Sequence, residues 1–301
     1  MGTSKIEWTE ATWNPVTGCT PISEGCEHCY AKRMATRLRG RCGYPAGAPF
    51  LVKVRPDRYN EPFGWRKSKK IFVCSMGDLF HEYVPFPWIN EVFSVIQRCA
   101  HHRFMVLTKR PERMRNYISK VLQVRGWPES DIPFPNVWMG ITAETQRRAD
   151  ERIPVLLEIP AARRFVSVEP MLGPVDLSQW LGRSGGLDWV ICGGETGPGA
   201  RPVHPDWVRS LRDQCQIAGV PFFFKSWGEW REANMDLPVR GTKFGCFMGD
   251  TFVPDYGNIF PQRYPEHINM ARIGKSNAGR ILDGRTWDEE PEDVNVSKEV
   301  R

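Results

Sequence analysis

Short apolar runs alternate with amphipathic helical patterns along most of this 301-residue chain, and this alternation limits the fold more than any other feature. The runs are continuously apolar, as in strands that are buried on both faces. Strands are expected at residues 70–75, 103–108, 136–142, 163–170, 187–194 and 220–227. Helices are expected from about Pro87, at 111–123, at 144–159 with Pro154 disturbing the pattern, and at 205–219.

Buried strands separated by helices predict a parallel sheet covered by helices, because each helical crossover returns the chain to the same edge of the sheet. About six or seven βα units are expected, beginning with the segment that holds the first cysteines. We therefore predict an α/β fold with a full or partial (β/α) barrel over residues 1–228. Residues 229–301 are expected to form a loop-rich C-terminal extension packed on the barrel, since Gly, Pro and aromatic residues are frequent there.

Three cysteines lie close together near the N-terminus. Cys19, Cys26 and Cys29 have the spacing C-x6-C-x2-C. Three thiolates suit an iron–sulfur cluster with one iron left open, whereas a closed structural zinc site requires four ligands. Zinc is the alternative if His28 or Cys42 supplies the fourth ligand. Cys42 has no second C-x2-C beside it, which favours the cluster.

Polar residues follow each expected strand. In a (β/α) barrel the carboxyl ends of the strands and the loops after them carry the active site. A carboxylate buried there needs a partner, such as the amino group or a ribose hydroxyl of a bound cofactor. For Thr142 and Glu144, a helix-cap pair is the alternative. The candidate strand-end residues are Ser75, Met76, Asp78, Thr108, Thr142, Glu144, Glu169, Glu195 and Lys225.

The formal net charge is +6, and the positive residues are clustered. The clusters are either ordinary solvated helix faces or a rim that binds a polyanion such as nucleic acid. Nine cysteines, no secretory segment and no apolar run of about 18 residues predict a cytoplasmic protein without a membrane span. The basic segments are Lys32 to Arg41, Arg66 to Lys70 and Lys109 to Arg115.

Several motifs together resemble a known group. The cysteine segment with the aromatic Tyr30 after it resembles the radical S-adenosylmethionine (SAM) superfamily, whose usual spacing is C-x3-C-x2-C. TWNPVTGCTPISEGCEHCYA, CSMGDLF, VSVEPMLGPVDL, VICGGETGPGARP, FFFKSWGEW and AGRILDGRTW are similar to segments of phage and bacterial three-Cys-motif proteins of unknown role. This resemblance covers about residues 6–290. The first cysteine gap is longer by three than in the superfamily pattern.

The resemblance implies a mechanism. Cys19, Cys26 and Cys29 would hold a [4Fe–4S] cluster whose unique iron binds SAM, and an electron would cleave SAM to methionine and a 5′-deoxyadenosyl radical. That radical would abstract a substrate hydrogen. An electron donor such as flavodoxin or ferredoxin is implied as a partner.

The resemblance also implies roles for the strand-end residues. Tyr30 would pack near the adenine. Ser75, Met76 and Asp78 would hold the SAM amino group, with Asp78 in place of the usual Gly-Gly-Glu. The other expected cofactor contacts are Thr108, Thr142, Glu144 and Glu169, and the residues expected to act in catalysis with the cysteines are Glu195 and Lys225.

Two functions from different classes follow. The first is a radical SAM enzyme that modifies, rearranges or repairs a base in DNA, since the basic clusters suit a nucleic acid and the SVEP strand end resembles the photoproduct lyase branch. The second is a zinc-stabilised module that binds nucleic acid or protein without catalysis. Metal analysis separates the two.

Overall fold

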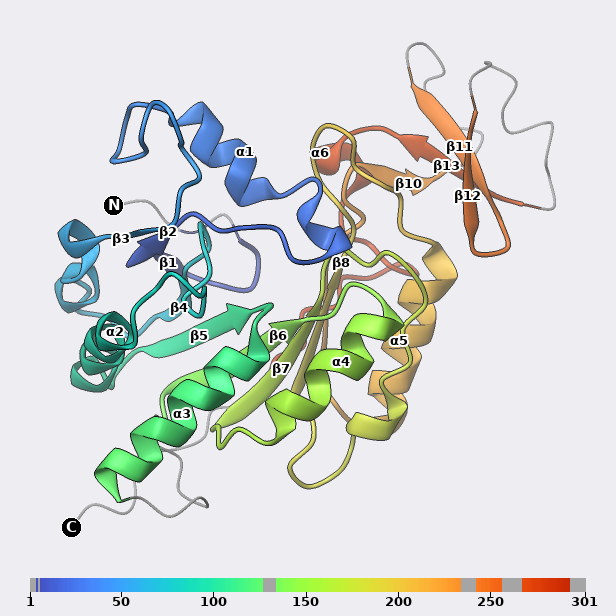
Figure 1. Cartoon of the computed structure of the whole chain (residues 1–301). Helices are drawn as coiled ribbons and strands as arrows, with labels where there is room; N and C mark the ends of the chain where they lie inside the picture. Colours follow the sequence, from blue (N-terminus) through green and yellow to red (C-terminus); the bar gives the residue numbers. More distant parts are fainter. Residues whose placement is uncertain (1–3, 5, 127–133, 234–241, 256–266, 293–301) are drawn as a thin grey trace.

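Seven parallel strands form one curved sheet at the centre of the computed structural model (Figure 1). The structure describes residues 4, 6–126, 134–233, 242–255 and 267–292. The strands follow one another across the sheet in chain order, and the first and last do not pair with each other. The fold is therefore a partial barrel, as the sequence predicts. The strands are β1 (Ala11–Trp13), β4 (Lys70–Val73), β5 (Arg103–Thr108), β6 (Val137–Thr142), β7 (Arg163–Val168), β8 (Trp189–Gly193) and β9 (Phe222–Ser226).

Helices cover the outer face of this sheet (Figure 1). Three of them begin with proline in the first turn, where its missing N–H has no helical partner. The helix expected at 144–159 is confirmed with Pro154 inside it. Pro154 leaves the Asp150 carbonyl without its helical partner, and α4 accommodates this because both residues face solvent. The helices are α1 (Tyr30–Arg37), α2 (Phe86–Arg98), α3 (Pro111–Arg125), α4 (Gln146–Leu157), α5 (Pro205–Ala218) and the short α6 (Lys275–Ala278).

The sheet has an apolar core on each face. Along β5, Phe104 and Val106 pack outward against the helices, whereas Met105 points inward. This alternation follows from the two-residue period of a strand. The inward cluster also contains Trp138, Phe165 and Trp189, which all lie in the first half of their strands. Large side chains therefore fill the amino-terminal end of the half-barrel and leave space at the carboxyl ends of the strands.

A second, antiparallel sheet follows the half-barrel in the sequence. Its order is β10-β13-β11-β12, and it occupies part of the segment that is expected to be rich in loops. The strands are β10 (Trp230–Glu232), β11 (Lys243–Met248), β12 (Thr251–Asp255) and β13 (Ile268–Arg272). Parts of the predicted extension, 234–241, 256–266 and 293–301, lie outside the described residues. The boundary at 228/229 stays a prediction.

Smaller elements complete the chain. A two-stranded sheet pairs β2 (Val16–Thr17) with β3 (Lys53–Val54). The 3-10 helices are η1 (Glu24–Cys26), η2 (Pro56–Arg58), η3 (Glu61–Gly64) and η4 (Ser178–Trp180). Among the described helices, none combines the length and apolar character needed to cross a membrane.

Candidate active site

A cavity of about 260 Å³ opens at the carboxyl edge of the parallel sheet. Its walls come from the loops that follow five consecutive strands and from the cysteine loop that follows β2. The strand-end lining residues are Ser75, Gly77 and Asp78 after β4, Thr108, Lys109 and Arg110 at β5, Thr142 at β6, Glu169 and Pro170 after β7, and Gly194, Glu195 and Thr196 after β8. Parallel strands bring these sequence-distant residues to one edge.

The three motif cysteines line this cavity together. Cys26 ends η1, and Cys29 directly precedes α1. Gly18, before the loop, has φ +84°, and a side chain there would collide with the Leu51 carbonyl. Within the described ranges, no three His, Cys, Asp or Glu side chains are grouped closely enough to hold a single metal ion. The three thiols nevertheless share one cavity wall.

Cys26 lies beside a cation. Burial alone would raise the pKa of its thiol, but the Lys109 ammonium and hydrogen bonds at Ile22 and Ser23 outweigh burial and lower that pKa. The Ser23 hydroxyl is 3.6 Å from Cys26 Sγ and donates to Glu144 Oε1 at 2.5 Å. A lower thiol pKa favours the thiolate, which is the form that binds metal.

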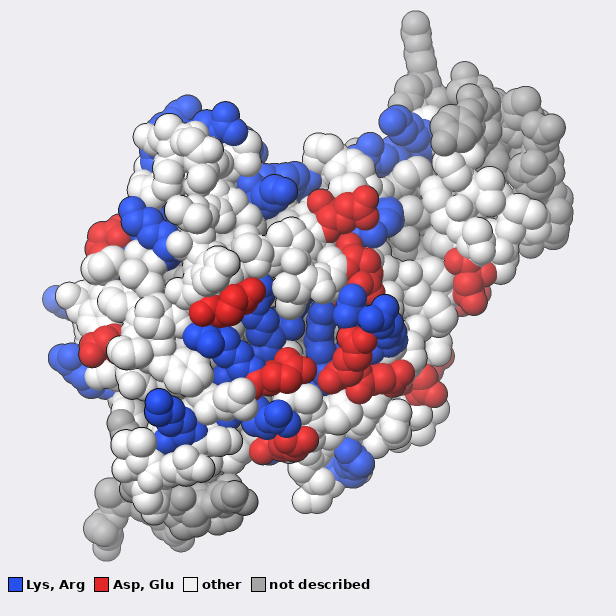
Figure 2. Space-filling model, in the orientation of Figure 1, with Lys and Arg blue, Asp and Glu red and all other residues white. Residues whose placement is uncertain are grey.

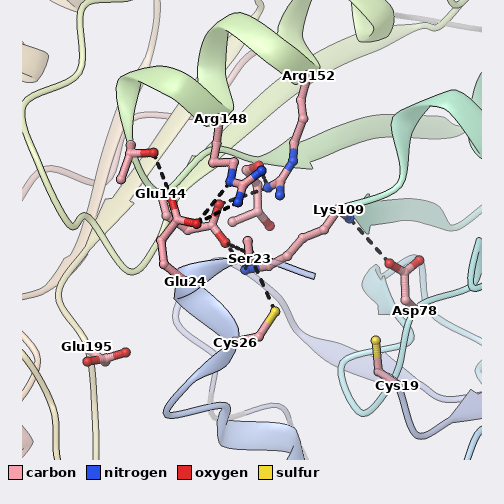
Figure 3. Close-up of polar contacts among 12 residues, drawn as sticks. Cys19, Ser23, Glu24, Cys26, Asp78, Lys109, Glu144, Arg148, Arg152 and Glu195 are labelled. Carbon is pink, nitrogen blue, oxygen red and sulfur yellow. Dashed lines mark hydrogen bonds and ion pairs between the residues drawn. The ribbon is translucent and has the colours of Figure 1, made fainter. Parts of the chain in front are cut away.

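Cys19 lies on the opposite side, near Asp78 (Figure 3). Burial and the Asp78 carboxylate raise the pKa of its thiol to about 12, against the Arg110 guanidinium, which lowers it. Arg110 Nη1 is 3.5 Å from Cys19 Sγ and 3.1 Å from Asp78 Oδ2. Asp78 also accepts from the Thr108 hydroxyl at 2.8 Å and from the Phe80 N–H at 2.9 Å. Its carboxylate is thus occupied by protein donors.

Glu144 ties the cysteine loop to the half-barrel (Figure 3). Its side chain is fully buried and accepts from Ser23, from the Lys109 ammonium and, at 2.9 Å, from Arg152 Nη1. Burial would raise the pKa of Glu144, but Lys109 and Arg152 outweigh it and lower the pKa. The side chain also fills the space where a Cβ on Gly25 would lie. The predicted alternative, a helix-cap pair with Thr142, is wrong because α4 starts after Thr145.

Arg201 holds the cysteine loop from the other side. It donates to both carboxylate oxygens of Glu195, at 2.6 and 2.9 Å, and its backbone N–H adds a third hydrogen bond to that carboxylate. The same guanidinium donates to the Glu24 carbonyl at 3.0 Å and to Glu27 at 3.0 Å. Glu195 is thus neutralised by the protein itself.

Glu169 lines the cavity beside Lys225. Its Oε1 accepts from Lys225 Nζ at 2.5 Å, and within the part of the chain that the structure describes its Oε2 has no hydrogen-bond donor. Burial would lower the pKa of Lys225, but Glu169 outweighs burial and raises it, so Lys225 stays charged. Among the predicted carboxylates that line the cavity, Glu169 is therefore better placed than Asp78 or Glu195 to accept a hydrogen bond from a ligand.

The structure brings most of the predicted site residues to the cavity wall and leaves three outside it. Met76 packs with Ala35 and Tyr44 beneath α1. Glu144 contacts the cysteine loop, and Lys225 contacts Glu169. The roles assigned to all of them stay predictions. The residues on the wall are Cys19, Cys26, Cys29, Tyr30, Ser75, Asp78, Thr108, Thr142, Glu169 and Glu195.

Several residues that shape the site have no assigned role in the sequence-based prediction. Lys109 and Arg110 directly follow Thr108 at a strand end, so their position in the sequence was a usable signal. Cys74 was expected in the core, yet it also lines the cavity. No sequence pattern indicates that Arg201 shapes the site, because its partners lie in two separate loops.

One family model decides where the chain belongs. The model, described as "Protein of unknown function (DUF5131)", matches residues 3–291. The chain is a member of the DUF5131 family. The match spans nearly all of the chain, including the cysteine loop and every strand of the half-barrel.

Solved structures with a similar shape to this DUF5131 protein were also found. A single-substitution mutant of spore photoproduct lyase is 12% identical, with a TM-score of 0.43 over 92% of this chain and 72% of that one. A double mutant of spore photoproduct lyase "with bound AdoMet and dinucleoside spore photoproduct" is 11% identical, with a TM-score of 0.41 over 89% of this chain and 69% of that one. No curated protein gave a significant match.

Proposed function

We propose that this DUF5131 protein is a radical SAM enzyme. One observation carries the proposal: the three cysteines of the C-x6-C-x2-C motif line the same cavity as the polar ends of five parallel strands. A [4Fe–4S] cluster with one open iron, when bound, supplies the electron that cleaves SAM reductively. Cys19, Cys26 and Cys29 would hold it.

The cavity residues suit such a group for electrostatic reasons. Thiolate ligands bring negative charge, and Lys109 and Arg110 place cations beside Cys26 and Cys19. The Lys109 ammonium favours the Cys26 thiolate. At Cys19 the Arg110 guanidinium offsets only part of the effect of burial and of the Asp78 carboxylate, which together raise the pKa of that thiol. Glu169, oriented by Lys225, would accept from the amino group or a ribose hydroxyl of SAM.

The proposed substrate is a base in DNA, which the enzyme would modify, rearrange or repair. The excess of Lys and Arg supports a polyanionic substrate. Tyr30, half exposed at the cavity, offers a ring on which a base can stack. A flavodoxin or ferredoxin would supply the electron.

Anaerobic reconstitution tests the proposal. The protein is loaded with iron and sulfide, reduced and given SAM, and 5′-deoxyadenosine is quantified. We expect about four irons per chain and product formation, both lost in Cys26→Ala. Cys42→Ala is the matched control, because Cys42 is exposed and does not line the cavity. Stoichiometric zinc without iron or sulfide would refute the proposal and favour a zinc-stabilised binding module.

The proposed role of Glu169 has a test of its own. Glu169→Ala removes the carboxylate that lines the cavity, and we expect weaker SAM binding by the reconstituted protein, measured by equilibrium dialysis. Glu195→Ala is the comparison, since both oxygens of Glu195 already accept from Arg201. A larger loss of SAM affinity in Glu195→Ala than in Glu169→Ala would contradict the assignment.

A further inference from the structure

The segment from the start of α1 to the end of η2 carries the protein's excess positive charge. Residues 30–58 contain eight Lys or Arg residues and one Asp, so their formal net charge is +7, against +6 for the whole chain. The remaining residues together have a net charge of −1. We call residues 30–58 the basic arm. Figure 2 shows Lys and Arg side chains over α1, whereas both signs mix around the hollow below it.

The fold does not use the outer cations of this arm. Lys32, Arg37, Arg39 and Arg41 are exposed, and none of them has an ion pair or side-chain hydrogen bond with another residue that the structure describes. By contrast, Arg110, Arg148 and Arg201 are each held by carboxylates. Unpaired like charges repel one another, so they lower stability unless a partner neutralises them.

The basic arm begins at the cavity. Tyr30, its first residue, lines the cavity with 50% of its surface exposed, and Ile22 on the neighbouring loop is 37% exposed. Leu51, within the arm, is 58% exposed and follows Phe50, which lines the cavity. Exposed apolar side chains at the cavity end of the arm and unpaired cations along it can contact a base and its phosphates respectively.

We propose that the basic arm binds the phosphate backbone of a nucleic-acid strand and so brings a base to the mouth of the cavity. The delivery of a base to this cavity rests on the proposed function. Most of the arm's cations are arginines, whose planar forks match phosphate oxygens bidentately. The aromatic ring at the cavity adds a stacking contact that an acidic protein partner would not require. Nucleic acid is therefore favoured over an acidic electron-transfer protein.

Salt-dependent binding to an oligodeoxynucleotide tests the basic arm without needing a cluster or SAM. For single strands, each phosphate contact contributes about 0.7 to the steepness with which the logarithm of the binding constant falls against the logarithm of the salt concentration. Changing Lys32, Arg37, Arg39 and Arg41 together to Gln is expected to lower that steepness by up to about 3 and to weaken binding at low salt. The matched control changes to Gln four exposed cations that lie outside the three basic segments and do not line the cavity: Arg98, Lys120, Arg183 and Lys243.

The outcomes separate the basic arm from the chemistry. Loss of binding in the arm variant and retention in the control, with uncoupled SAM cleavage unchanged in both, supports the proposal. Equal slopes in both variants, or no binding by the unaltered protein at low salt, overturn it. Salt-sensitive binding to a flavodoxin in place of DNA overturns the choice of nucleic acid. DNA binding without SAM cleavage would leave the arm standing and refute the proposed function.

Discussion

Neutralising Glu144 tests whether the buried charges at the cysteine loop support the fold. Glu144→Gln keeps the size of the side chain and removes its charge. It leaves two cations without their shared partner: Arg152, whose side chain is 5% exposed, and Lys109, which is 20% exposed. Removing one member of a buried ion pair costs about 3–5 kcal/mol. Lys109 can turn toward the cavity, and Arg152 keeps its hydrogen bond to the Thr142 carbonyl. A loss of about 3 kcal/mol in the free energy of unfolding is therefore expected, at the lower end of that range.

Urea unfolding at neutral pH measures this loss as a shift in the free energy of unfolding. Glu158→Gln is the control, because Glu158 pairs with Arg115 at the surface and is 57% exposed. The control is expected to lose less than about 1 kcal/mol. If Glu144→Gln loses no more than Glu158→Gln, the reasoning about the buried charges is wrong.

The pH dependence of the same difference checks its electrostatic origin. The pKa of Glu144 is lowered in the folded protein, because Lys109 and Arg152 outweigh the effect of burial. The carboxylate therefore stabilises the fold above its unfolded pKa of about 4.3, and this contribution is lost as pH falls through the lower folded value. The difference in the free energy of unfolding between the unaltered protein and Glu144→Gln should be constant near neutral pH and should shrink below about pH 4. A difference that persists in acid would indicate a packing effect.

Two further predictions concern the cysteine loop itself. In the metal-free protein at mildly alkaline pH, iodoacetamide should alkylate Cys26 faster than Cys19, as followed by peptide mass spectrometry. Lys109→Met should slow the reaction at Cys26, because it removes the cation that lowers the pKa of that thiol. Equal rates at both thiols would contradict the pKa shifts. Gly25→Ala places a Cβ 2.5 Å from the Glu144 side chain and should lower the iron bound after reconstitution, whereas Gly64→Ala, with nothing within 4 Å of its Cβ, should leave iron binding unchanged.

Features that depend on strand position could be predicted from the sequence. Buried parallel strands read as continuous apolar runs, and their carboxyl ends share one edge of the sheet. The sequence therefore predicts Thr108, Thr142 and Glu169 at that edge, and all three line the cavity there. The helix bounds also follow from local signals, such as Gly219, which ends α5 in the left-handed conformation. The antiparallel sheet after β9 was missed, because its strands are short and interrupted by Gly and Pro.

The side-chain directions just beyond the strands could not be predicted in the same way. Cys74, directly after β4, has φ +61°, a left-handed conformation that is unusual for a residue other than glycine. That turn ends the two-residue alternation, so Asp78 lines the cavity while Met76 packs under α1. A pattern of apolar and polar residues carries no signal for such a turn.

Charge partners across the cavity were the least predictable part, since opposite charges pair by position in space. Glu195 and Glu144 are both expected near a ligand, and the structure pairs Glu195 with Arg201 and Glu144 with Lys109 and Arg152, partners that the sequence does not indicate. Burial makes this outcome reasonable, because a buried carboxylate needs a cationic or hydrogen-bonding partner to be stable. Glu169 differs because it lines the cavity and Lys225 holds only one of its oxygens, so within the described residues the other oxygen has no protein donor. The carboxylates that hold the loop in place and the one left to bind a ligand are therefore distinguished by how many of their oxygens the protein already satisfies.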